Sequence, residues 1–184
     1  ITYKFSKYTK INLGSRFSNY ENVYSATGTN YGTPIKNIND SIANELFAFH
    51  LSLKHQINEK FNFFSSINRG YKAGGINQNP YLDESQRFYK AEYNLNLNGG
   101  FGYFSDMYEG EINFFYMNRS QQQVGLYFQV IPDVPTSFSF YTANANAGYN
   151  SGIETTIKLN VNNNSSIIFN SGVLSNYVGK FNDP

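Results

Sequence analysis

The sequence predicts an all-β protein in which about eight antiparallel strands form a segment of a membrane-spanning β-barrel. Apolar and polar residues alternate with a period of two over many segments, as they do along β-strands. Aromatic residues make up 18% of the chain and charged residues only 15%. No run of about 18 apolar residues exists that would form a membrane-spanning helix. The mean hydropathy of −0.47 agrees with alternation, which hides an apolar outer face within a polar average.

The clearest strand covers residues 93–103, where apolar side chains alternate with amides and glycines. One face carries Tyr93, Leu95, Leu97, Phe101 and Tyr103, and the opposite face carries Asn94, Asn96, Asn98, Gly100 and Gly102. We expect the first face to contact lipid and the second to contact water.

The other elements follow in chain order, with short and long connections in turn. Clear alternation marks residues 11–18, 47–54 and 153–161, and weaker alternation begins at Ile1, Phe61, Ile112 and Ile167. Short polar turns are predicted at residues 6–10, 58–60, 105–109 and 162–165, and long connections at residues 25–44, 74–88 and 121–136. Antiparallel neighbours place all the short turns at one end, an asymmetry typical of outer-membrane barrels.

Charged residues in the strands keep mostly to the polar face, because a lysine or arginine facing lipid at mid-bilayer costs about 2–4 kcal/mol. Arg16, Lys54 and Lys158 have the polar parity. Arg69 instead falls on the same face as Phe61, which is the apolar face. Either its side chain reaches the membrane interface, or a bulge turns it toward the lumen.

Other classes remain open or are disfavoured by composition. A soluble β-sandwich alternates in the same way, and eight strands also suffice for a complete small barrel. The net charge is +1 without a basic cluster, which argues against nucleic acid as a partner, and cysteine is absent. The first residue is not Met and already reads as strand, so we expect a fragment cut at both ends.

Four stretches resemble one family, in the order in which that family has them. Residues 66–77 read S-I-N-R-G-Y-K-A-G-G-I-N and are similar to the S-x-G-[YF]-K-A-G-G-F-N stretch of TonB-dependent outer-membrane receptors, especially the ferric-siderophore class. Residues 91–99, 111–124 and 146–154 resemble the family's P-E-x…Y-E-L-G, N-x-x-x-F-Y…D-x-Q-V and N-A-G…G-x-E segments. The sequence departs from the family pattern at two points. Asn96 or Asn98 stands where the family has the second glutamate of its segment, and residues 118–120 lack the aspartate that usually precedes the glutamine.

The resemblance implies that residues 1–184 belong to a plugged barrel of about 22 strands, whose plug and terminal strands lie outside this sequence. It further implies an outer-membrane receptor that imports a ferric siderophore or similar nutrient. The partners would be outer-membrane lipid and the TonB energy-transduction complex, reached through the plug. Iron arrives already chelated, so no cofactor or protein-bound metal is expected. A structural or adhesive barrel with ligand-binding loops is the alternative.

Candidate site residues lie where the family motifs meet the long connections. Predicted ligand contacts are Arg69, Tyr71, Lys72, Asn77, Gln122 and Tyr127. Predicted structural motif residues are Gly70, Gly74, Gly75, Glu92, Asn146, Gly148, Gly152 and Glu154. No catalytic residue is predicted, because His50 and Ser52 share a face without an orienting partner or an oxyanion hole.

Overall fold

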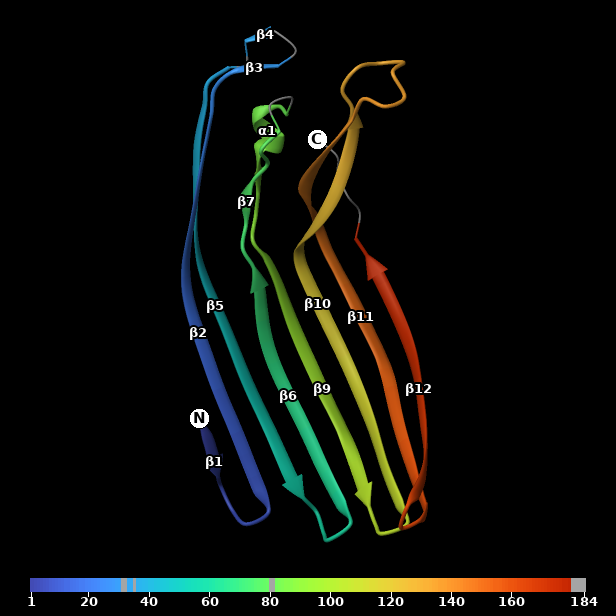
Figure 1. Ribbon diagram of the computed structural model, residues 1–184. Helices are drawn as coiled ribbons and strands as arrows, with labels where there is room; N and C mark the ends of the chain where they lie inside the picture. The colour runs from blue at the N-terminus through green and yellow to red at the C-terminus, as the bar shows by residue number, and fades with distance from the viewer. Residues whose placement is uncertain (31–32, 35, 80–81, 180–184) are drawn as a thin grey trace.

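The computed structural model describes residues 1–30, 33–34, 36–79 and 82–179, and its main feature is an eight-stranded antiparallel sheet (Figure 1). The strands lie in chain order, each beside the next one in the sequence. They are β1 (Thr2–Lys4), β2 (Thr9–Ala26), β5 (Ile38–Gln56), β6 (Phe61–Lys72), β9 (Glu92–Phe104), β10 (Tyr108–Gln129), β11 (Phe138–Asn162) and β12 (Ser165–Val178). Within the described residues β1 and β12 each pair with one neighbour, so the sheet is open. The predicted all-β fold is confirmed.

Smaller elements occupy the connections at one end of the sheet. β3 (Thr29–Asn30) pairs with β4 (Thr33–Pro34) beyond the β2–β5 hairpin. β7 (Gly75–Ile76) pairs with β8 (Phe88–Tyr89), and the short helix α1 (Glu84–Arg87) lies between them in the sequence. In the described part of the chain, no helix has the length and apolarity needed to cross a membrane.

Short and long connections lie at opposite ends of the sheet, as predicted (Figure 1). The extents predicted for the long connections were wrong, because the strands continue into them. Residues 25–44 and 121–136 include paired strand residues as far as Ala26 opposite Ile38 and Gln129 opposite Phe138. These hairpin arms satisfy their backbone groups by pairing with each other, which favours strand over loop.

The register divides the sheet into an apolar face and a polar face. One row across the apolar face is Leu13, Leu51, Ile67, Leu97 and Tyr116. The next row, on the polar face, is Asn12, Ser52, Ser66, Asn98 and Phe115. Arg16, Lys54 and Lys158 pair within polar-face rows, as predicted from parity.

Nothing among the described residues covers the apolar face. Leu13, Leu97 and Val173 are 54%, 41% and 73% exposed. The buried apolar residues are Ile38, Leu46, Ile76, Leu82, Tyr141 and Ala145, all toward the end with the long connections. A soluble sandwich would bury one face of this sheet against a second sheet, so the sandwich alternative does not describe the structure.

Candidate functional site

The candidate site lies at the end of the sheet with the long connections, around a bridging segment formed by residues 73–79 and 82–91. This segment lies between the β2–β5 hairpin and the β10–β11 hairpin (Figure 1). On one side, the Tyr24 hydroxyl donates to the carbonyl of Gln78 at 3.3 Å, and the backbone N–H of Gly74 donates to Asn44 Oδ1 at 3.3 Å. The segment therefore joins strands that are distant in the sheet.

Arg87 anchors the bridging segment to β5 through an ion pair. Its Nη1 lies 3.2 Å from Asp40 Oδ2, and the two side chains are only 12% and 22% exposed. Arg87 Nη2 also donates to the carbonyl of Leu82 at 3.4 Å. Partly buried pairs of this kind cost more to break than surface pairs, because the remaining charge stays poorly hydrated.

Asn77 anchors the other side of the bridging segment to β11. Its Nδ2 donates to the carbonyls of Gln86 and Thr142, both at 2.8 Å, and its Oδ1 accepts from the Thr142 N–H at 2.8 Å. The amide of Asn77 both donates to and accepts from the backbone of Thr142, as a paired strand residue would. The residue is buried. Asn144 makes a similar link, because its Oδ1 accepts from the Lys90 N–H at 2.7 Å.

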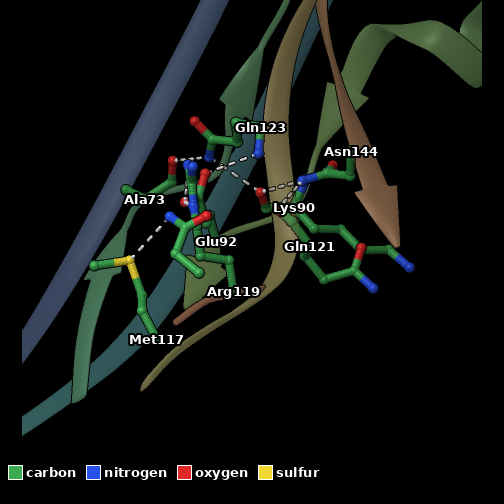
Figure 2. A network of polar contacts seen from close by, with 9 residues as sticks. Ala73, Lys90, Glu92, Met117, Arg119, Gln121, Gln123 and Asn144 are labelled. Carbon is green, nitrogen blue, oxygen red and sulfur yellow. Dashed lines mark hydrogen bonds and ion pairs between the residues drawn. The ribbon is translucent and has the colours of Figure 1, made fainter. Parts of the chain in front are cut away.

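Glu92 is the centre of a polar network where the bridging segment enters β9 (Figure 2). Its Oε1 accepts from Arg119 Nε at 2.8 Å and from Arg119 Nη2 at 2.5 Å. Its Oε2 accepts from the Gln123 N–H at 2.8 Å. Gln123 Nε2 then donates to the carbonyl of Ala73 at 2.7 Å. One buried carboxylate therefore links β9, β10 and the bridging segment.

Close backbone approaches explain two glycines of the first motif. A Cβ on Gly74 would lie 2.5 Å from the carbonyl oxygen of Tyr89, and one on Gly75 would collide with the Tyr89 hydroxyl. No atom lies within 4 Å of the position that a Cβ on Gly70 would take. An alanine at position 74 would clash with the backbone of residues 89–91, whereas an alanine at position 75 would require the Tyr89 ring to move.

The last motif lies on β11, where glycines make room for neighbouring side chains. A Cβ on Gly148 would lie 2.9 Å from Gln122 Oε1, and a Cβ on Gly152 would lie 2.7 Å from Phe115 Cζ. Asn146 lies opposite Gln121, at a position that the β10–β11 ladder skips. The backbone of Gln121 is left-handed, with a φ of 54°. Figure 1 shows the two arms of this hairpin crossing, which brings the upper part of β11 toward α1.

The polar face below the bridging segment is a wall of amides. A hollow of about 250 Å³ is lined by Asn96, Asn98, Asn113, Phe115, Tyr116, Met117 and the motif residue Glu154. The Oδ1 atoms of Asn94, Asn96 and Asn113 are buried and accept no hydrogen bond from the described residues. The amide side chains that line the hollow carry both donors and acceptors.

The predicted ligand contacts fall in different environments. Arg69 pairs with Phe49 and Leu95 in an unbroken ladder, so it lies on the apolar face and no bulge turns it inward. The Tyr71 hydroxyl donates to Ser18 Oγ at 2.7 Å, which ties the end of β6 to β2. Lys72 is exposed at the end of β6, whereas the amide of Asn77 is engaged within the chain.

Gln122 and Tyr127 both lie on the upper part of β10. Gln122 is half-buried beside Gly148, and Tyr127 is 67% exposed. The Tyr127 ring lies 5.5 Å from that of Phe138 and 6.4 Å from that of Phe140, measured between centroids. We refer to Tyr127, Phe138 and Phe140 as the aromatic cluster. Sequence reasoning missed the two phenylalanines, although their alternation in S-F-S-F-Y was a usable signal.

The described residues contain no group of three or more His, Cys, Asp or Glu placed to hold a metal ion. The exposed aromatic rings of the aromatic cluster and the amides below it are groups that suit binding of a ligand.

Comparison with known proteins identifies the family. Residues 1–183 match the family described as TonB dependent receptor-like, beta-barrel. The chain belongs to this family. No curated protein of similar sequence was found.

Solved structures of two receptors and a transporter share the fold. The ferric yersiniabactin uptake receptor FyuA from Yersinia pestis superposes with a TM-score of 0.76 at 19% identity, over 96% of this chain and 26% of that one. The copper transporter OprC gives a TM-score of 0.68 at 12% identity, over 93% and 28%. The siderophore receptor PirA from Pseudomonas aeruginosa gives 0.62 at 15% identity, over 95% and 30%. The chain thus spans between a quarter and a third of the length of these proteins.

Proposed function

We propose that this chain is part of the barrel domain of an outer-membrane receptor that takes up a ferric siderophore, or a similar large nutrient chelate, in a TonB-coupled process. The observation that carries the proposal is the two-faced sheet in a member of the TonB-dependent receptor family. An uncovered apolar face is costly in water and stable against lipid. Related folds include a ferric yersiniabactin uptake receptor and a siderophore receptor, which favours an iron chelate as cargo.

In this proposal the apolar face contacts outer-membrane lipid, and the polar face lines the lumen. The short turns lie on the periplasmic side, and the bridging segment and aromatic cluster lie on the extracellular side. The amide wall would exchange hydrogen bonds with a plug, because Asn96, Asn98 and Asn113 line a hollow there. TonB would act on that plug, outside residues 1–184, and the cargo would cross without chemical change.

The proposed ligand contacts are the aromatic cluster together with Lys72 and Gln122. Phe140 and Tyr127 are the most exposed of these rings, at 73% and 67%, and they suit stacking on a catechol or heterocycle. Lys72 would attract an anionic chelate. Tyr71 and Asn77 hold the supporting structure, because their polar groups bond within the chain.

The test uses the full-length receptor in cells that lack their own copy. Uptake of radioactive iron supplied as a ferric siderophore should depend on the receptor and should stop when an uncoupler dissipates the proton-motive force. Uptake that persists with the uncoupler would contradict TonB coupling. An unchanged uptake and unchanged iron-limited growth without the receptor would contradict the transport function and favour an adhesive or structural barrel.

Ligand contact is tested separately by binding to the purified receptor. Tyr127→Ala combined with Phe140→Ala should weaken binding of the chelate about tenfold, given about 0.5–1.5 kcal/mol for each aromatic contact. Ile131→Ala is the control, because Ile131 is 52% exposed in the same hairpin and carries no aromatic ring. Equal affinities for both variants would remove the aromatic cluster from the site.

A further inference from the structure

One charged side chain interrupts the apolar face between its two aromatic rows. The upper row contains Phe17, Phe47 and Tyr93, and the lower row contains Phe61, Phe63, Phe101 and Tyr103. Tyr149 and Tyr177 lie in the same row as Arg69. The register places Arg69 between these rows. Every other apolar-face position between them on β2, β5, β6, β9, β10, β11 and β12 is uncharged in the described residues.

The position of Arg69 is fixed by backbone pairing on both sides. It lies opposite Phe49 on β5 and Leu95 on β9, and the β6–β9 ladder continues without a shift from Phe61 to Lys72. A shift of one residue would be needed to turn Arg69 to the polar face. The side chain therefore stays outside the lumen.

The guanidinium is oriented but has no anionic partner in the described residues. Its central carbon lies 4.1 Å from the centroid of the Tyr93 ring, a cation–π distance. Tyr93 is two ladder pairs beyond Leu95 toward the end with the long connections, so the guanidinium leans toward that end. The described ion pairs involve Lys36, Arg87, Arg119 and Lys158, and none involves Arg69.

The height of Arg69 places this cation near a membrane surface. Eight residues separate it from Phe61 in the lower row, which corresponds to about 19 Å at about 3.3 Å per residue and a tilt near 45°. The outward apolar band of such barrels is about 25 Å tall. The guanidinium, leaning upward, therefore reaches the level where acyl chains meet headgroups.

We propose that Arg69 and Tyr93 form a site on the outside of the barrel for the phosphate of a lipid headgroup in the outer leaflet. The ring of Tyr93 holds one face of the guanidinium, and the N–H groups along its edge remain free to donate to phosphate oxygens in pairs. Phe49 and Leu95 flank the cation and offer apolar contact to an acyl chain. This inference rests on the membrane placement proposed above, and it removes Arg69 from the cargo site.

The test measures binding of synthetic bis-phosphorylated lipid A to the full-length receptor in mild detergent by native mass spectrometry. Arg69→Gln should lower the bound fraction severalfold, and Arg69→Lys should fall between this variant and the wild type, because it keeps the charge without the paired donors. Tyr93→Leu should also weaken binding, since the guanidinium loses its stacking partner. Lys72→Gln is the matched control: it removes the same charge from β6 on the opposite parity and should bind as the wild type does.

Two further arms separate the possible outcomes. Lipid A without phosphates should bind the wild type and Arg69→Gln equally, and inorganic phosphate should not compete. Equal binding of the phosphorylated lipid by wild type and Arg69→Gln would overturn the proposal, and so would effective competition by inorganic phosphate. Iron uptake by Arg69→Gln is an independent measurement, because this variant should transport normally. Failure of uptake in the wild type would contradict the transport function alone.

Discussion

Replacing Glu92 with glutamine should release the bridging segment while leaving the sheet folded. The carboxylate accepts two hydrogen bonds from Arg119 and one from the backbone of Gln123. Breaking a buried pair costs about 3–5 kcal/mol, and the 32% exposure of the Arg119 side chain moves this value toward about 2 kcal/mol. Since each 1.4 kcal/mol is a factor of about ten, local opening should become roughly 30-fold more frequent.

Hydrogen exchange of the full-length receptor in detergent measures this opening directly. Amides of residues 73–79 and 82–91 and that of Gln123 should exchange faster in Glu92→Gln, while amides near the short turns keep their protection. Glu109→Gln is the control, because Glu109 bonds Lys158 at 2.8 Å near the opposite end of β10. The reasoning is refuted if residues 73–91 exchange at the wild-type rate in Glu92→Gln, or equally fast in both variants.

Three further substitutions test separate parts of the structure. Asn77→Ala should cost about 1–3 kcal/mol of local stability and speed exchange at Thr142, whereas the exposed neighbour Gln78→Ala should not. Gly152→Ala should lower the folded yield on a mobility-shift gel, because a Cβ at this position meets the carbonyl of Val173 and the ring of Phe115. Gly125→Ala should fold normally, because no atom lies within 4 Å of the position that its Cβ would take. Gln121→Val should lower the unfolding temperature, since a β-branched residue tolerates the φ of 54° poorly, and an equal effect of Gln121→Gly would contradict this explanation.

The two faces of the sheet were predictable because alternation is a local property of the sequence. Asn96 and Leu97 are adjacent in one strand, so their side chains lie on opposite faces of the sheet. Strand pairing extends the same two faces across the neighbouring strands. The short turns were equally local. The lengths of the long connections were not, because residues 122–129 form strand only by pairing with residues 138–145.

The contacts of the bridging segment could not be read from the sequence. The partner of Asn77 on β11 is 65 residues away, and its position depends on the pairing of β11 with residues 122–129 of β10. Glu92 was noted as a motif residue, and Arg119 only as part of a departure from the family pattern. The structure shows that these two residues pair, which gives both a role in support of the site.

The most direct measurement concerns the uncovered face of the sheet in the full-length receptor. The sequence described here has no cysteine, so single cysteines at Leu95, Asn96, Leu97 and Asn98 can carry spin labels at chosen positions of β9. In bilayers, labels at Leu95 and Leu97 should be accessible to oxygen dissolved in lipid, and labels at Asn96 and Asn98 should not. Equal accessibility of all four labels to a water-soluble relaxation agent would contradict the membrane placement, and the uptake function would lose its structural support.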